Sequence, residues 1–202
     1  MKRSTIIWLI VIGIIIIMAF GLFRYVVNTY DKAVAYEEAV IAQWGNVESS
    51  YQRRADLIPN LVTTVKAYSD YEKETLTRVI EARAKATSIN IDPKNMTPET
   101  FQKFQQAQGE LSSALSRLLV VMEKYPELKA NQNYLDLQAE LAGTENRINV
   151  ERRKYNESVQ IYNRHIRGLI RSLALRIAGG EFERKEVFKA EAGAEKAPKV
   201  EF

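Results

Sequence analysis

The pattern of hydrophobic and polar positions predicts helices along nearly the whole chain. From Ile6 to Phe23 the sequence carries no charged residue over about 18 positions, which at 1.5 Å of rise per residue approaches the ~30 Å hydrocarbon thickness of a bilayer. Trp8 lies near one end of this segment and Phe23 at the other, where interfacial aromatic side chains gather. We therefore predict a single membrane-spanning helix within an anchor of residues 1–25.

A cleavable signal peptide is the alternative to this anchor. Its apolar stretch would be roughly 7 to 15 residues long and would end in small residues, for which only Ala19-Phe20-Gly21 is a weak candidate. Cations flank the apolar segment on both sides, with Lys2 and Arg3 before it and Arg24 and Lys32 after it, so its orientation stays open. We predict a single-pass protein of the plasma (inner) membrane, with its N-terminus cytoplasmic and its helical domain outside.

Heptad patterns predict two helices after the anchor. Val26, Ala33, Val40 and Val47 are seven apart, no turn signal separates them from the span, and Pro59 should end this first helix because it lacks a backbone donor. The second helix fades into a loop over residues 88–95. Its predicted stripe consists of Leu61, Val65, Tyr68, Leu76 and Val79.

Two further helices complete the predicted fold. Thr97-Pro98-Glu99 provides a hydroxyl cap, a proline at the first helical position and an acid in the first turn. After an interruption at Tyr125-Pro126, Asn131 or Asn133 should cap a fourth helix that runs to about Ala178, before Gly179-Gly180. The stripe of the third helix is Leu111, Leu115, Leu118 and Met122.

These elements predict an all-α protein, with an N-terminal transmembrane helix followed by an antiparallel four-helix bundle over residues 26–180. Residues 181–202 form a charged, alanine-rich C-terminal tail that composition alone would predict to be disordered.

Composition leaves little room for catalysis. The 202 residues contain no cysteine and one histidine, His165, which we expect to be a surface or packing residue. No pair of Glu-x-x-His motifs, phosphate-binding glycine loop or nucleophile elbow occurs. We predict no catalytic, cofactor-binding or metal residues, no cofactor and no enzymatic activity. The net charge of +4 comes mostly from cations beside the span, so nucleic acid is not implied.

Charged residues interrupt the predicted core stripes. A charge at such a position is costly unless it is paired, so we expect an ion-pair network that fixes helix register; a polar ligand or partner site inside the bundle is the alternative. This core polar network would consist of Glu37, Glu72, Glu145 and Arg152.

Two surfaces are candidates for lipid or partner binding. Arg164, Arg167 and Arg171 share one predicted helix face opposite apolar residues, and this face would touch anionic headgroups if the fourth helix returns to the bilayer. A plain bundle seam with a solvated basic face is the alternative. Val200 and Phe202 stand two residues apart before the terminal carboxylate, which suits a groove of the PDZ type.

Several strings, in this order, resemble the LemA family. They are Trp44-Gly45-Asn46-Val47-Glu48, Arg53–Val62, Glu123–Ala130, Gly143–Ile148, Glu151–Asn156 and Pro198–Phe202. The resemblance implies a bacterial single-pass anchor with an antiparallel four-helix bundle and no established activity, in a family often found beside membrane metalloproteases. Asp31, Tyr71 and Ala142 depart from the family pattern, so any role of the usual residue there does not carry over.

The sequence thus predicts a non-enzymatic, membrane-anchored helical scaffold or adaptor of the bacterial cell envelope. Its partners would be the lipid bilayer and other membrane or envelope proteins, membrane proteases among them, with a homo-oligomer left open and no nucleic acid. The alternative is a membrane-coupled sensor or transducer that passes a signal from the anchor into the bundle.

Overall fold

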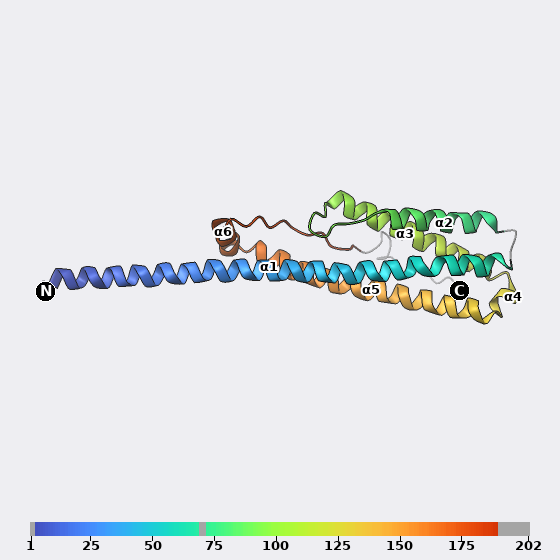
Figure 1. The fold of residues 1–202 in the computed structure, drawn as a ribbon, viewed down its shortest axis with the longest axis horizontal. Coiled ribbons are helices and arrows are strands. Elements are labelled where there is room, and N and C mark those ends of the chain that lie inside the picture. The colour runs from blue at the N-terminus through green and yellow to red at the C-terminus, as the bar shows by residue number, and fades with distance from the viewer. Residues whose placement is uncertain (1–2, 69–71, 190–202) are drawn as a thin grey trace, which may run out of the picture. The chain divides into compact units, whose positions relative to one another are not determined.

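The computed structural model describes residues 3–68 and 72–189, and within them it contains six α-helices and no β-strand (Figure 1). The helices are α1 (Arg3–Lys66), α2 (Lys73–Ser88), α3 (Pro98–Met122), α4 (Pro126–Lys129), α5 (Gln132–Ile166) and α6 (Leu169–Ile177). The predicted all-α fold class is therefore confirmed. The antiparallel order of the four-helix bundle stays a prediction.

The chain divides into two compact units. The anchor unit comprises Met1–Val40 and Ser158–Lys185, and the core unit comprises Ile41–Glu157 and Glu186–Phe202. Helices α1 and α5 each contribute to both units. The predicted domain boundaries at residues 25 and 180 stay predictions.

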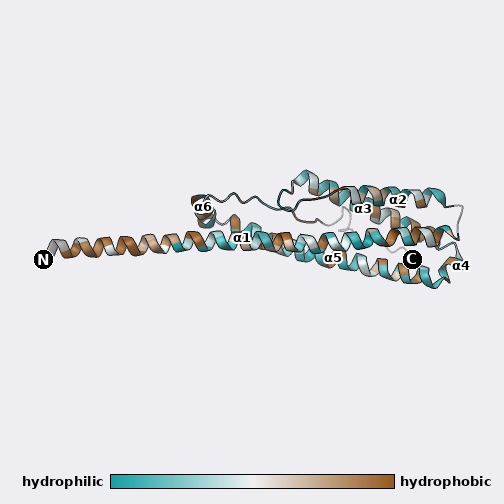
Figure 2. Cartoon of the chain, viewed as in Figure 1, coloured by the Kyte–Doolittle hydropathy of each residue, from teal (hydrophilic) through white to brown (hydrophobic). Residues whose placement is uncertain are grey.

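The apolar start of α1 is fully available to a membrane. Trp8 is 67% exposed and Ile17 is 72% exposed, and Figure 2 shows this part of the helix as a largely hydrophobic ribbon. Within the described residues, α1 is the one helix long and apolar enough to cross a bilayer. This confirms the single candidate span. Its orientation remains a prediction.

The predicted end of the first helix at Pro59 is wrong, because α1 continues through Pro59 to Lys66. A proline cannot donate to the carbonyl four residues earlier, here that of Ala55. The Nε atom of Arg83 on α2 donates to this carbonyl instead, at 2.7 Å. Ile58 and Leu61, on either side of the proline, are both fully buried. A distant side chain and core packing therefore offset the local defect.

It follows that the predicted second helix is divided differently. Leu61 and Val65 belong to α1, whereas Leu76 and Val79 belong to α2. All four are buried in one apolar cluster of the core unit, to which helices α1 to α5 contribute. The cluster contains Ile58, Leu61, Val65, Leu76, Val79, Ala86, Ala107, Leu111, Leu115, Leu118, Met122, Leu128, Tyr134 and Leu141. The predicted stripe of the third helix lies entirely within it.

The starts of α3 and α5 agree with the capping residues in the sequence. The Thr100 backbone N–H donates to Thr97 Oγ1 at 3.2 Å, and the Thr97 N–H donates to Thr100 Oγ1 at 3.1 Å. This is a capping box with threonine in both positions. Before α5, Asn131 Oδ1 accepts from the Tyr134 N–H at 3.1 Å. Both predicted starts are confirmed.

The predicted fourth helix is interrupted between α5 and α6 at Arg167 and Gly168, which is a correction to its expected length. The predicted stop after it is confirmed. Gly179 has φ = +73°, and the Gly180 N–H donates to the Leu175 carbonyl at 3.0 Å. The left-handed conformation at Gly179 closes α6 with a Schellman motif.

Candidate functional site

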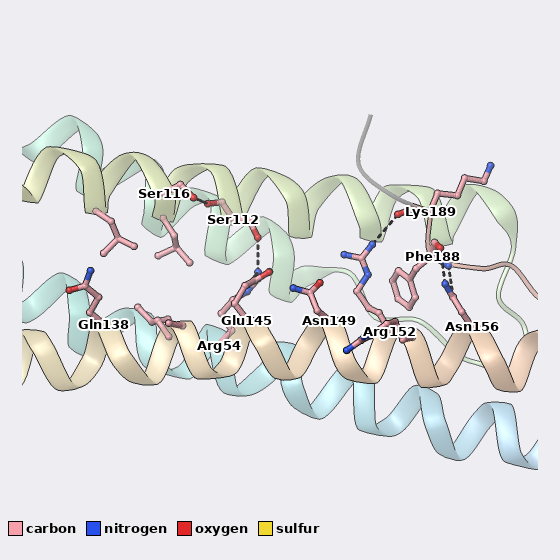
Figure 3. A pocket seen from close by; sticks show the side chains of 15 residues that line it. Arg54, Ser112, Ser116, Gln138, Glu145, Asn149, Arg152, Asn156, Phe188 and Lys189 are labelled. Atoms are coloured by element: carbon pink, nitrogen blue, oxygen red, sulfur yellow. Dashed lines mark hydrogen bonds and ion pairs between the residues drawn. The ribbon is translucent and has the colours of Figure 1, made fainter. Parts of the chain in front are cut away.

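A groove lies between α3 and α5 in the core unit (Figure 3). Its volume is about 750 Å³. Helix α3 supplies Ser112 and Ser116, α5 supplies residues from Gln138 to Asn156, and α1 supplies Arg54. Phe188 and Lys189, from the segment after α6, line one end of the groove.

Arg54 is the most buried cation of the groove, with only 2% of its surface exposed. Its Nη1 atom donates to Ser112 Oγ at 2.7 Å and to Glu145 Oε2 at 2.8 Å. Its Nη2 atom donates to Gln108 Oε1 at 2.7 Å and to the Gln108 carbonyl at 3.2 Å. The buried Nε has no hydrogen-bond partner in the described part of the chain. Arg54 thus ties α1 to both helices that form the groove walls.

The segment Glu181–Lys189, which we call the strap, has no regular secondary structure but is held by asparagines of α5. In the core unit, Asn156 Nδ2 donates to the Phe188 carbonyl at 2.9 Å, and Asn156 Oδ1 accepts from the Phe188 N–H at 2.8 Å. In the anchor unit, Asn163 makes the same pair with the backbone of Lys185, at 2.9 and 3.1 Å. A side-chain amide has N–H donors and a carbonyl acceptor side by side, so it can pair with the C=O and N–H of one residue. These contacts therefore recognise backbone rather than side chains.

Phe188 fixes the strap in an aromatic cluster. Its ring is stacked on Trp44, with centroids 6.0 Å apart, and lies 4.9 Å from Phe101. The Arg152 guanidinium lies 4.8 Å from the same ring, and Arg152 Nη2 donates to the Lys189 carbonyl at 3.1 Å. The expectation of disorder from residue 181 onward is therefore wrong for the strap, because one buried aromatic side chain and paired amides order it.

Tyr155 belongs to the same cluster, with its ring 5.4 Å from that of Phe188. Burial raises the pKa of the Tyr155 hydroxyl well above its usual value of 10, and the negative charge of Glu186 adds to this effect. The hydroxyl faces the sulfur of Met96 at 3.7 Å. Tyr155 therefore stays protonated at neutral pH and has a packing role.

The structure does not join the four charges of the predicted core polar network. Glu145 and Arg152 both line the groove, but Glu145 pairs with Arg54 and Arg152 contacts the strap. Glu72, before α2, accepts from the Tyr125 hydroxyl at 3.0 Å. In the anchor unit, Glu37 pairs with Lys185 at 3.0 Å. Each charge therefore has its own local partner.

Glu151 is a buried carboxylate of the core unit that the sequence patterns did not predict. Burial raises its pKa, but a hydrogen bond from Gln43 at 2.7 Å and the charges of Lys154 and Arg147 outweigh burial, so the pKa is lowered overall. Gln43 and Glu151 connect α1 to α5. Gln43 does not lie on the heptad stripe of Val26, Ala33, Val40 and Val47, so this stripe did not indicate the contact.

His165 has the expected packing role, since it is buried and its Nε2 lies 2.9 Å from the Thr29 carbonyl. Arg164, Arg167 and Arg171 do not form one helix face. Arg164 lies on α5, Arg167 lies between the helices, and Arg171 on α6 donates to the Arg164 carbonyl at 3.3 Å. The prediction of a continuous basic face is therefore wrong, because the helix breaks at Gly168. Val200, Phe202 and Tyr71 lie outside the described residues.

The lining of the groove carries more positive than negative charge. It combines the cations Arg54, Arg152, Arg153 and Lys189 with the single carboxylate of Glu145. Asn149 is exposed in the groove and makes no hydrogen bond within the described part of the chain. No group of three His, Cys, Asp or Glu residues is placed to hold a metal ion among the residues that the structure describes.

Comparison with known proteins gives one family and several distant relatives. The LemA family model matches residues 43–202, a range that includes every residue lining the groove. Protein LemA of Metamycoplasma hominis is 22% identical over 151 residues, covering 74% of this chain and 65% of the relative. Magnetosome protein MamQ of Magnetospirillum gryphiswaldense is 24% identical over 180 residues, covering 81% and 65%. Magnetosome protein MamQ 2 of Paramagnetospirillum magneticum is 25% identical over 172 residues, covering 77% and 62%. The chain thus spans slightly less than two thirds of each relative.

Proposed function

Because this chain belongs to the LemA family, we propose that it is a non-enzymatic, membrane-anchored scaffold of the bacterial cell envelope. Its groove between α3 and α5 binds an extended, acidic segment of another membrane or envelope protein. The candidate span in α1 supports the membrane attachment of this scaffold.

One observation carries this proposal: Asn149, Asn156 and Asn163 stand one heptad apart on α5, and two of them already hold backbone that has no regular secondary structure. The third, Asn149, is exposed in the groove and has no hydrogen-bond partner within the described residues. It is therefore available to pair with the backbone of a bound segment in the same way.

The charges of the groove indicate the chemistry of that segment. Arg152 and Arg153 both follow Asn149 on α5 and line the groove between Asn149 and the strap. The carboxylate of Glu145 is already paired with Arg54. Acidic side chains in the bound segment would complement the two arginines and speed the encounter. The family resemblance suggests membrane proteases as candidate partners. A second copy of the chain is a further candidate.

Photocrosslinking from the groove tests the proposal. A photoreactive amino acid replaces Asn149 in the full chain within native membranes, and a matched variant carries it at Ile80, which is 51% exposed on α2 outside the groove. We expect Asn149 to give discrete adducts whose crosslinked peptide is acidic, and Ile80 to give none of them. Identical adducts from both positions, or attachment to neutral helical segments, would contradict a peptide-binding groove.

A transducer is the second candidate, and the continuity of α1 favours it. One helix runs from Arg3 through the candidate span to Lys66, whose end packs in the core unit. Cysteines in place of Gln43 and Glu151 are joined by a short bis-maleimide, because side chains whose tips meet at 2.7 Å leave their Cβ atoms too far apart for a direct disulfide. The chain has no native cysteine that would compete. A scaffold keeps its groove adducts when α1 and α5 are locked, whereas a transducer loses its response to partner or lipid.

The side of the membrane is tested separately. Asn90, exposed in the loop between α2 and α3, is replaced by cysteine and probed in intact cells with a membrane-impermeant maleimide. We expect labelling of intact cells, because we propose that the core unit lies outside the cytoplasm. Protection until lysis would reverse this orientation and redirect the search to cytosolic partners.

A further inference from the structure

Helix α6 of the anchor unit exposes an apolar face that its own unit does not cover. Leu169 is 87% exposed, Ile170 68%, Leu173 60% and Ile177 65%. Ala174 and Leu175, on the other side of the helix, are only 3% exposed. Figure 2 shows the hydrophobic character of this short helix. An exposed cluster of large aliphatic side chains indicates a surface that is buried in the working protein.

Contacts on both sides of α6 fix its position along α1. Just before α6, His165 Nε2 lies 2.9 Å from the Thr29 carbonyl. Just after it, the ring of Phe182 lies 5.6 Å from that of Tyr30, and a side chain at Gly180 would come within 3.0 Å of Tyr30. The chain therefore reaches α6 and leaves it at neighbouring residues of the same helix.

The direction of the strap shows that α6 lies toward the apolar segment of α1. Phe182 contacts Tyr30, and three residues later Lys185 pairs with Glu37. The strap thus moves away from the apolar segment as it leaves α6. Helix α5 runs toward the apolar segment until His165 meets Thr29, and the strap runs away from it after Phe182. The chain therefore reverses its direction at α6, which is the part of this reversal nearest to Phe23.

The distance to the bilayer is short. Thr29 follows Phe23 by six residues, which corresponds to about 9 Å of helical rise. Each polar interface of a bilayer is roughly 5 to 8 Å thick. A helix held at Thr29 therefore lies at the outer edge of the headgroup layer, less than two turns of α1 from the apolar segment.

Cations surround α6, as expected beside anionic headgroups. Arg24 follows the span, Arg167 precedes α6, and Arg176 lies in its last turn; all three belong to the anchor unit. The acid nearest in sequence is Asp31 for Arg24, Glu157 for Arg167 and Glu181 for Arg176. Arginines near the surface of an anionic leaflet each contribute attraction.

We propose that α6 is an interfacial helix, which inserts Leu169, Ile170, Leu173 and Ile177 into the same membrane leaflet from which α1 emerges. Lipid is the occupant that these observations favour, because the exposed aliphatic face and the apolar segment of α1 belong to one compact unit, in which the start of α6 is held at Thr29, six residues beyond Phe23. The span alone leaves the protein free to rotate and tilt. A second contact at α6 fixes the anchor unit against the bilayer surface. This inference rests on membrane anchoring and not on the groove.

Depth measurements with spin labels test the proposal in the full chain. Since the chain has no cysteine, Leu173→Cys carries a single nitroxide label in vesicles of phosphatidylcholine and phosphatidylglycerol. Matched variants are Phe20→Cys, which is in the span, and Ile80→Cys on α2, with residues 64% and 51% exposed. The label's accessibility to oxygen and to a water-soluble nickel complex reports its depth.

We expect the Phe20 label to be deep in the hydrocarbon, the Leu173 label to be shallow but shielded from nickel, and the Ile80 label to be in water. A Leu173 label as accessible to nickel as the Ile80 label would overturn the proposal. Shielding of Leu173 from both reagents would also overturn it, because it would indicate burial against a second copy. A Phe20 label in water would overturn the anchor itself. The groove adducts from Asn149 are independent of all these results.

Discussion

Asn156 and Phe188 form a closed pair of hydrogen bonds, in which the side-chain amide of one matches the backbone of the other at 2.9 and 2.8 Å. Phe188 is also buried, with only 6% of the residue's surface exposed, and its ring packs against Trp44. The last part of the strap, which includes Phe188, is therefore part of the core unit and carries a share of its stability.

Phe188→Ala should destabilise the full chain by about 3 kcal/mol, because it removes an aromatic ring from a packed cluster and leaves a cavity. Urea unfolding in detergent micelles, followed by circular dichroism, measures this change. Ile80→Ala is the matched control at an exposed site and should change the free energy of unfolding by less than about 0.5 kcal/mol. Equal effects of the two substitutions would mean that the strap does not contribute.

Asn156→Ala should cost about 1 to 3 kcal/mol, because it leaves two backbone groups of Phe188 without partners. Asn149→Ala is the matched control on the same helix, one heptad away, and should leave the stability unchanged. The same unfolding assay applies. If both variants lose stability equally, Asn149 has a structural role and the proposed partner site loses its main support.

Arg83 and Pro59 should be energetically coupled. Arg83→Ala should cost roughly 1.5 to 3 kcal/mol in the wild type, because the Ala55 carbonyl then loses its charged donor. In a Pro59→Ala background the backbone N–H of residue 59 supplies that bond, and the same substitution should cost markedly less. A double-mutant cycle on the free energy of unfolding measures the coupling. Strictly additive effects would refute the explanation given for the unbroken helix.

Arg54→Lys should destabilise the core unit by about 2 kcal/mol. It keeps the charge but loses the fork that reaches Gln108, Ser112 and Glu145 together. Glu145→Gln should cost less than about 1 kcal/mol, since the Glu145 side chain is 45% exposed and its ion pair is screened by water. Hydrogen exchange of α3 and α5 amides checks the order of the two effects. The reverse order would assign the stabilisation to the ion pair instead of the fork.

Glu151 should make the protein less stable in acid. Its pKa in the folded protein lies below the ordinary 4.5, so ionisation stabilises the fold; this contribution is complete above pH 4.5 and is lost as the pH falls through the folded pKa. Glu151→Gln should therefore flatten the decline in urea midpoint between pH 6 and about pH 3. The exposed Glu157→Gln should follow the wild type. An unchanged slope for Glu151→Gln would contradict the lowered pKa.

Much of this fold follows from sequence alone, because the relevant signals are local. The apolar segment ending at Phe23 predicts the span, Thr97 and Asn131 predict the starts of α3 and α5, and Gly179 predicts the end of α6. Each signal acts within one or two helical turns. The heptad stripes likewise identify most residues of the core cluster, since helical periodicity depends only on spacing.

Tertiary structure decided the features that depend on partners distant in sequence. Pro59 remains inside α1 because Arg83 donates to the Ala55 carbonyl, which the proline cannot reach. The strap is ordered because Asn156, Asn163 and the aromatic cluster hold it. Arg54 becomes a buried junction for the same reason. Composition and periodicity describe what a segment prefers by itself, whereas hydrogen bonds and burial supplied by remote side chains determine whether that preference prevails.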